Sequence, residues 1–172
     1  MSQIRKRRRI RLHLAQWTIN TFFKGTHYFA IKRHLLRSAG LIIAENAKIV
    51  GPIHFDTNMI DIGKNTWIGK NFCVYGNGSV KVGSDCDLAP DIILETGSHK
   101  IGTFSHRAGE GYCGEIIIGN GCWLGIRTTL LPNIKIGDGS IIAAGAVVNK
   151  DVDSNLLVGG IPCKTIRKIE DE

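Results

Sequence analysis

The chain has 172 residues, of which 43% are hydrophobic and only 7% aromatic. This length predicts one domain with a core of aliphatic side chains, and nothing in it argues for two domains. The net charge of +7 comes from the N-terminal segment, because residues 1–40 contain ten Lys or Arg and no acid, whereas the other 12 basic residues are outnumbered by 15 acidic ones. The five cysteines include no CxxC pair, which argues against a disulfide framework and a zinc site.

Residues 1–40 form this basic N-terminal segment. Apolar residues at helical spacing, with breaks at Gly25 and Gly40, predict two short helices that cap one end of the domain. The segment lacks the cleavage site of a signal peptide and is too short and too polar to span a bilayer, so we expect a cytoplasmic protein.

The first of these helices is also strongly basic and partly aromatic. Six basic residues between Arg5 and Arg11, with Trp17, Phe22 and Phe23 behind them, favour peripheral contact of residues 5–23 with the inner, anionic face of a membrane over a solvated cap. Nucleic-acid binding is not expected, because no basic groove with interleaved aromatic residues follows.

From residue 41 the sequence repeats with a period of six. Aliphatic residues fill successive slots six positions apart: Ile118, Leu124, Leu130, Ile136, Ile142 and Val148. Earlier runs with the same spacing begin at Ile43 and slip by one or two residues. This period fits a short strand followed by a tight corner, repeated three times per triangular coil. We therefore predict a parallel β-helix over residues 41–153, with about five coils at the ~4.8 Å strand spacing, and a C-terminal tail over residues 154–172.

The repeat is interrupted between Leu94 and Ile118. These two residues are four periods apart, but the slots between them hold Lys100, His106 and Tyr112, none of which belongs in an aliphatic interior. One coil's worth of chain, about residues 100–115, is therefore expected to leave the coil as a loop. Long loops inside a compact domain are usually functional.

Four segments in this order carry a resemblance to a known family: TGSHKIG, IIIGNGCWLG, LLPNIKIGDGSIIAAGAVVNKDV and VGGIPCKTIRKI. Over residues 41–168 the chain resembles the hexapeptide-repeat acyltransferases, especially the galactoside, maltose and bacterial polysaccharide (colanic acid type) O-acetyltransferases. The resemblance implies a left-handed parallel β-helix, a homotrimer, and transfer of an acetyl group from acetyl-CoA, without a metal, to a hydroxyl of a sugar. It suggests a role in the biosynthesis of an exopolysaccharide, capsule or lipopolysaccharide.

The resemblance also implies roles for particular residues. His99 matches the catalytic base, and Asn71 matches a residue that contacts the acceptor. His106 is not part of this match, and its place in the loop fits either an acceptor contact or ordinary loop surface. The acetyl-CoA site is expected at Trp123, Ile126, Ala144, Asn149, Lys150, Lys164 and Arg167. In this set the backbone amide of Ile126 would hold the thioester oxygen, and the cations suit phosphates. The chain departs from the sugar enzymes after Thr-Gly, where Ser98 precedes the histidine and Lys100 stands in place of proline.

Acetyl transfer to a hydroxyl needs a base. A hydroxyl attacks a thioester slowly until its proton is withdrawn, and an imidazole can take that proton and then give it to the departing thiolate. An acid is expected to orient the ring, and Asp87, Asp91 and Glu95 are all near in sequence. Cys113 is an alternative nucleophile in the loop, although it has no recognisable activating neighbour.

Other functions fit the same coil. Serine acetylation, N-acetylation of a nucleotide amino sugar and antibiotic acetylation are alternatives within the enzymes. A metal-dependent hydrase would need three histidines around a metal, but only His99 and His106 lie near the loop and His54 is turns away. A purely structural coil would not need the loop. We therefore predict an acetyltransferase without a metal.

Overall fold

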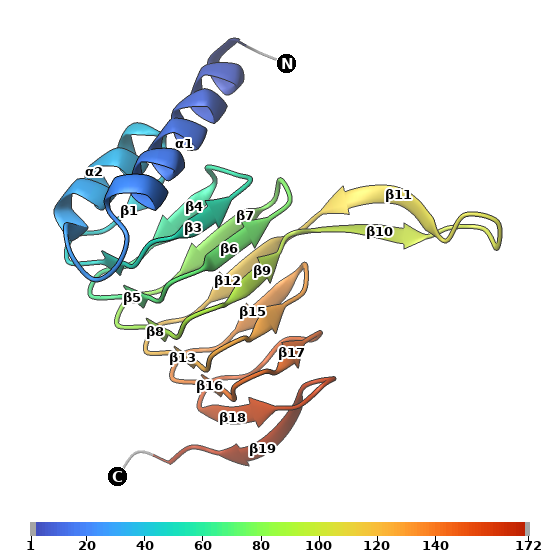
Figure 1. Ribbon diagram of the computed structural model, residues 1–172. Coiled ribbons are helices and arrows are strands. Elements are labelled where there is room, and N and C mark those ends of the chain that lie inside the picture. The colour runs from blue at the N-terminus through green and yellow to red at the C-terminus, as the bar shows by residue number, and fades with distance from the viewer. Residues whose placement is uncertain (1–2, 171–172) are drawn as a thin grey trace.

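The structure, a computed structural model, describes residues 3–170 and, in the first helix, the side chains at position 7 and from position 9 onward. Two helices, α1 (Gln3–Phe22) and α2 (Phe29–Ser38), precede a coil of short strands (Figure 1). With 20 residues, α1 is longer than the short helix that the sequence predicts. Leu12, Ile19 and Leu36 are buried in the same cluster as the coil interior, so the two helices close its N-terminal end.

Three faces of parallel strands form the coil, and each turn contributes one strand to each face. The first face contains β1 (Ile42–Ile43), β4 (Ile60–Ile62), β7 (Ser79–Val82), β12 (Glu115–Ile118) and β15 (Ile134–Ile136). The second contains β2 (Lys48–Ile49), β5 (Trp67–Ile68), β8 (Asp87–Leu88), β13 (Trp123–Leu124), β16 (Ile141–Ile142), β18 (Leu156–Gly159) and β19 (Lys164–Lys168). The third contains β3 (Ile53–Phe55), β6 (Phe72–Tyr75), β9 (Ile93–Glu95), β14 (Thr129–Leu130) and β17 (Val147–Val148).

The coil continues one strand further than the repeat in the sequence. The first and third faces each have five strands, which gives the five turns expected. Strand β18 then adds a sixth rung to the second face by pairing in parallel with β16. Strand β19 turns back antiparallel to β18, so β18 itself continues the coil and the expected tail begins only after it.

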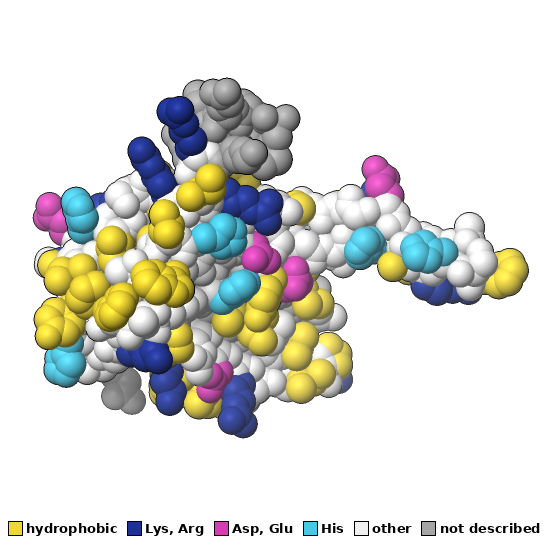
Figure 2. Space-filling model, turned by 45° about the horizontal axis from the view of Figure 1, so that its top comes forward, with side chains coloured by type: hydrophobic (Ala, Val, Ile, Leu, Met, Phe, Trp, Pro, Cys, Tyr) yellow, Lys and Arg dark blue, Asp and Glu magenta, His cyan; other side chains and the backbone are white. Residues whose placement is uncertain are grey.

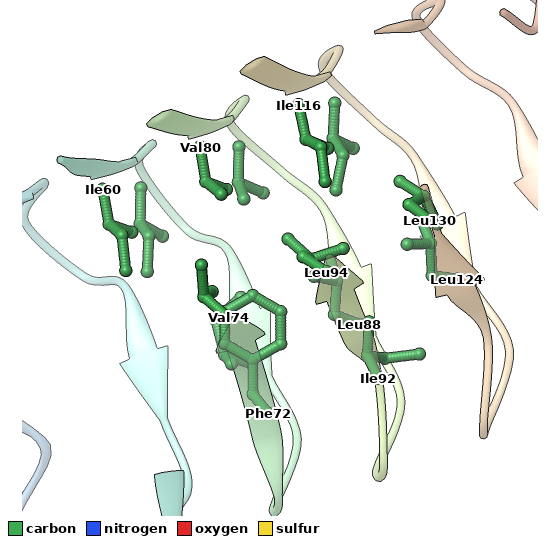
Figure 3. Packing of buried hydrophobic residues seen from close by; sticks show 14 of the residues in the cluster. Ile60, Phe72, Val74, Val80, Leu88, Ile92, Leu94, Ile116, Leu124 and Leu130 are labelled. Atoms are coloured by element: carbon green, nitrogen blue, oxygen red, sulfur yellow. The ribbon is translucent and has the colours of Figure 1, made fainter. Parts of the chain in front are cut away.

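The interior is a stack of aliphatic side chains (Figure 3). All slots of the unbroken run from Ile118 to Val148 are at most 1% exposed, as the period of six predicts. In-register pairing stacks similar side chains on one another, for example Ile116 beside Ile134. Each fully buried Leu or Ile side chain stabilises the fold by about 1.5–3 kcal/mol. This regular stack fixes which residues face outward at each corner and strand.

The corners need backbone torsions that most side chains avoid. The corner between the first and second faces carries one residue with left-handed φ per turn: Asn46, Asn65, Asp85, Gly121, Gly139 and Asn155. Asn and Asp tolerate this region better than other residues with a side chain, and Gly has no Cβ to clash. Their side chains also bond along the stack, as where the Asn65 Nδ2 donates to Asp85 Oδ1 at 2.9 Å.

Candidate active site

The interruption of the repeat is an antiparallel hairpin that projects from the corner between the third and first faces (Figures 1 and 2). Its strands are β10 (Gly97–Ile101) and β11 (Ala108–Cys113). Val82 and Ile118 stack in register although they are 36 residues apart, whereas Ile118 and Ile136 are only 18 apart. The excursion is therefore one coil's worth, as predicted. It begins at Gly97 and not at Lys100, because residues 97–99 already pair with β11.

Thr96 anchors the base of the hairpin and is fully buried. Its Oγ1 donates a hydrogen bond to the carbonyl of Tyr75 at 2.6 Å and accepts one from the amide of Gly78 at 3.0 Å. Its own carbonyl accepts from the amide of Gly114 at 2.7 Å, where the chain re-enters the coil. Thr96 thus links the point where the chain leaves the coil, the point where it re-enters the coil and the preceding turn, so the hairpin starts from a fixed position.

His99 lies on β10, near that base. Its Nδ1 is 2.8 Å from the carbonyl oxygen of Gly109 on the neighbouring strand. A carbonyl can only accept a hydrogen bond, so Nδ1 carries the proton of the neutral ring and Nε2 carries the free lone pair. The ring borders an open depression of about 500 Å³ whose walls include Asn77, Glu95 and Tyr112. A hydroxyl that enters this depression would find a proton acceptor already oriented.

None of the three acids proposed from the sequence bonds to the His99 ring within the described chain. Asp91 accepts from the Asn71 side-chain amide at 2.7 Å. Asp87 is exposed on the second face, beside Trp123. Glu95 lies in the same depression as His99, but its Oε1 accepts from the amide of Gly97 at 2.9 Å. The backbone carbonyl of Gly109 therefore takes the orienting role that was expected of an acid.

His106 lies further out along the hairpin than His99. It lies in the tip, where its amide donates to the carbonyl of Thr103 at 3.1 Å, and its side chain is exposed. Two strongly exposed apolar side chains precede it in the chain, Ile101 at 89% and Phe104 at 87% exposure. His106 is not among the residues that border the His99 depression. Any contact of His106 with the acceptor would need a second chain or a long acceptor to bridge the two positions.

A second group of predicted residues gathers at a different corner, between the second and third faces. Asn71 has left-handed φ of 58° there, and Ile126 and Ala144 occupy the same corner on later turns. Both Ile126 and Ala144 are exposed, and their backbone amides donate to no acceptor among residues 3–170. Trp123 is close by on β13 and is 54% exposed. Unpaired amides on exposed residues suit the oxyanion role proposed for Ile126.

The remaining predicted residues lie at the C-terminal end of the coil. Lys150 and Lys164 border one cavity of about 170 Å³. Burial raises the pKa of the nearby Cys163 thiol, and the charge of Lys150 partly offsets this effect. Arg167, on β19, pairs with Leu157 of β18, and both Arg167 and Asn149 are exposed. The structure thus brings two of the predicted cations together, whereas Arg167 lies outside the residues that border that cavity.

Several absences bear on the alternatives. Among residues 3–170, no three side chains of the metal-binding types cluster as a metal site would require. All five cysteines are free thiols, and Cys113 is exposed on β11 at the edge of the His99 depression. Neither described helix has the length and hydropathy needed to cross a membrane.

Sequence reasoning missed two contributors to the site. The Gly109 carbonyl has no sequence signal, since any residue could supply it and only the strand pairing puts it beside His99. Thr96 could have been noticed, because it is the polar residue directly before the glycine that opens the interruption.

Comparisons with known proteins agree with this architecture. Residues 115–150 match the family model for the bacterial transferase hexapeptide (six repeats), and residues 59–90 match that for the hexapeptide repeat of succinyl-transferase. The galactoside O-acetyltransferase of Escherichia coli is 32% identical over 152 residues, which cover 87% of this chain and 75% of that protein.

Solved structures extend the similarity to the fold. A galactoside acetyltransferase in complex with coenzyme A superimposes with a TM-score of 0.85 at 29% identity, covering 99% of this chain and 85% of the other. The polySia-specific acetyltransferase NeuO gives a TM-score of 0.64 at 31% identity, covering 76% and 58% of the two chains. The expected left-handed parallel β-helix is confirmed by the first of these matches. Identity of this extent on the same coil shows that the chain belongs to the hexapeptide-repeat acetyltransferases.

Proposed function

We propose that this protein transfers the acetyl group of acetyl-CoA to a hydroxyl of a sugar, with His99 as the general base. The observation that carries the proposal is the hydrogen bond from His99 Nδ1 to the Gly109 carbonyl, because it orients the ring and makes Nε2 the proton acceptor of the neutral imidazole, on a residue that borders an open depression. Acetyl-CoA as cosubstrate is supported by the related galactoside acetyltransferase, whose structure contains coenzyme A.

The reaction balances with one shuttled proton. Nε2 of His99 removes the proton of the acceptor hydroxyl while the hydroxyl oxygen attacks the thioester carbonyl carbon. The carbonyl oxygen gains negative charge, which the free amide of Ile126 would stabilise. The C–S bond then breaks, the acetyl group stays on the sugar oxygen, and the thiolate of coenzyme A takes the proton from Nε2.

A complete site requires a second copy of the chain. His99 belongs to the corner between the third and first faces, whereas Trp123 and Ile126 belong to the second face and its corner with the third. A contact that joins one corner of a subunit to a different corner of the next is heterologous, and it forms a ring when the rotation between subunits closes. Three subunits suit a prism with three faces, so we propose a homotrimer with three shared sites.

The acceptor is proposed to be a polysaccharide, its oligosaccharide or a lipid-linked precursor. Two features support this choice: the depression beside His99 is open, so a long acceptor can extend past it, and the related NeuO is specific for polySia. Asn71 and His106 are proposed acceptor contacts from the two sides of the shared site.

Release of the coenzyme A thiol from acetyl-CoA tests the activity. The acceptor panel contains mono- and oligosaccharides, a bacterial polysaccharide, serine, a nucleotide amino sugar and a hydroxyl-bearing antibiotic. Acetylation of saccharide hydroxyls is expected to dominate. His99→Ala should lower the rate by about 10²- to 10⁴-fold, whereas His106→Ala should lower it less and Cys113→Ser should not change it. A wild-type rate for His99→Ala would show that another group is the base.

Subunit mixing tests the shared site. The variants His99→Ala and Trp123→Ala are each expected to be poorly active, but a site built from two chains can combine the intact His99 of one with the intact Trp123 of the next. Random reassembly of equal amounts should restore about a quarter of the wild-type sites. If the mixture is no more active than its components, the site belongs to one chain.

A further inference from the structure

Helix α1 presents two opposite apolar faces. One face is buried against the rest of the molecule and includes Leu12, Ala15 and Ile19. On the other side, Ile10, Leu14 and Trp17 follow one another at helical spacing and remain 52%, 58% and 60% exposed. Surface helices normally cover that side with polar residues, so this exposed stripe has no role in closing the coil.

Aromatic side chains extend the stripe toward the end of the helix. Trp17 packs edge-to-face on Phe22 with ring centroids 5.6 Å apart, and Phe22 is itself 63% exposed. Tyr28 follows in the turn after α1 and is 61% exposed. Tryptophan, tyrosine and phenylalanine are the residues that favour the boundary between lipid headgroups and acyl chains.

The same helix is strongly basic at its free end. The N-terminal turns of α1 extend beyond α2 and the coil (Figure 1), and the side chains of Arg7, Arg9 and Arg11 are exposed. The side chains of Arg5, Lys6 and Arg8 lie outside the described part of the chain. In the sequence the first acid is Glu45, so no carboxylate within residues 1–40 neutralises these cations.

We propose that the outer face of α1 is a docking surface for an anionic lipid membrane. Ile10, Leu14 and Trp17 enter the interfacial layer, and the arginines of the free end pair with negatively charged headgroups. Charge complementarity favours lipid over pairing with the same helix of a second copy, because that contact would bring like-charged segments together. The apolar stripe favours lipid over nucleic acid, which the arginines alone could bind. The proposal is independent of the acetyl acceptor.

Sedimentation with vesicles tests this docking on the full chain. Phosphatidylcholine vesicles with and without phosphatidylglycerol serve as the probes. The protein should bind only the anionic vesicles, and salt should weaken the binding. Arg7→Gln, Arg9→Gln and Arg11→Gln together should reduce the affinity by about 100-fold, since each charge near such a surface is worth about fivefold. Leu14→Gln with Trp17→Gln should reduce it by about tenfold or more.

A matched control removes three exposed cations from the coil instead: Lys64→Gln, Lys70→Gln and Lys81→Gln. This variant has the same net charge as the arginine variant and should bind anionic vesicles like the wild type. Equal losses in the two triple variants, or unchanged binding of the Leu14 and Trp17 variant, would overturn the proposal.

Two further outcomes would assign the face to another partner. Duplex DNA that binds as tightly as the anionic vesicles, with no loss in the Leu14 and Trp17 variant, would indicate a nucleic-acid surface. A change of molar mass in light scattering for that variant would indicate a contact between subunits. Either result would contradict membrane docking.

Discussion

Replacement of Thr96 by valine tests how the coil holds the hairpin that bears His99. Valine has nearly the same shape as threonine but no hydroxyl. The substitution removes the hydrogen bond to the Tyr75 carbonyl and leaves the amide of Gly78 without its acceptor in a buried position. The Tyr75 carbonyl keeps a second donor, the amide of residue 96 at 2.9 Å. The unpaired Gly78 amide is therefore the main loss.

The expected loss of stability follows from that count. A buried amide without a partner costs about 1–3 kcal/mol, and no cavity or overpacking adds to it. We expect the free energy of unfolding to fall by about 2 kcal/mol, which lowers the melting temperature of a chain of this size by about 4–8 °C. Thr96→Ser keeps the hydroxyl and loses one methyl group, so it should cost only about 1 kcal/mol.

Thr66 provides a matched control on another corner. It is also fully buried, its Oγ1 donates to the Gly83 carbonyl at 2.8 Å, and it accepts from the Cys86 amide at 3.2 Å. Thr66→Val should therefore lose similar stability. Well below the melting temperature, only Thr96→Val should also lower kcat for acetyl transfer, because only Thr96 lies at the base of the His99 hairpin.

The comparison of the two valine variants decides the argument. Circular dichroism melting gives the stability of each, and coenzyme A release gives the activity. If both variants lose equal stability and retain equal kcat, the hairpin does not depend on Thr96 for its position. A loss below about 0.5 kcal/mol in Thr96→Val would refute the assignment of Gly78 as a buried, singly bonded amide.

Three further predictions concern the cap, the core and the cofactor. Burial lowers the pKa of Lys32 from its usual 10.5, so the folded state releases this proton at a lower pH than the unfolded state does. The free energy of unfolding should therefore rise as pH approaches 10.5 from below, and Lys32→Met should abolish that rise in denaturation experiments at alkaline pH. Leu124→Ala, at a fully buried site, should cost about 2–5 kcal/mol in chemical denaturation, and a loss under about 1 kcal/mol would contradict close packing. Lys164→Ala with Arg167→Ala should weaken acetyl-CoA binding at least about tenfold by calorimetry, and unchanged affinity at low salt would leave both as plain surface.

The fold could be predicted from the sequence because its repeat is local. Leu124 and Ile142 both face inward, because they are a whole number of periods apart and each turn repeats the geometry of the turn before it. The strand β18 escaped prediction because Leu156 to Gly159 no longer keep the period, although they still pair with β16. At β18, pairing with a neighbouring strand decides whether the segment belongs to the coil, and this register is a property of the tertiary structure.

The site could be predicted only in part. The sequence pointed to His99 because it lies in TGSHKIG, one of the segments that resemble the hexapeptide-repeat acyltransferases, at the point where the repeat is interrupted. It favoured an acid as the partner of the ring, and the chain instead uses the Gly109 carbonyl. Side-chain partners leave a trace in residue type, whereas a backbone carbonyl leaves none, so only strand pairing could reveal it.

The sequence by itself determined the periodic coil, the length of the excursion and the charge of the first helix, because these depend on residue types at fixed spacing. Only the tertiary structure decided where the outward side chains meet. His99 and Trp123 are 24 positions apart, yet they lie on different corners and faces of the prism. Three strands per turn send neighbouring segments in three directions, so proximity along the chain does not give proximity in space.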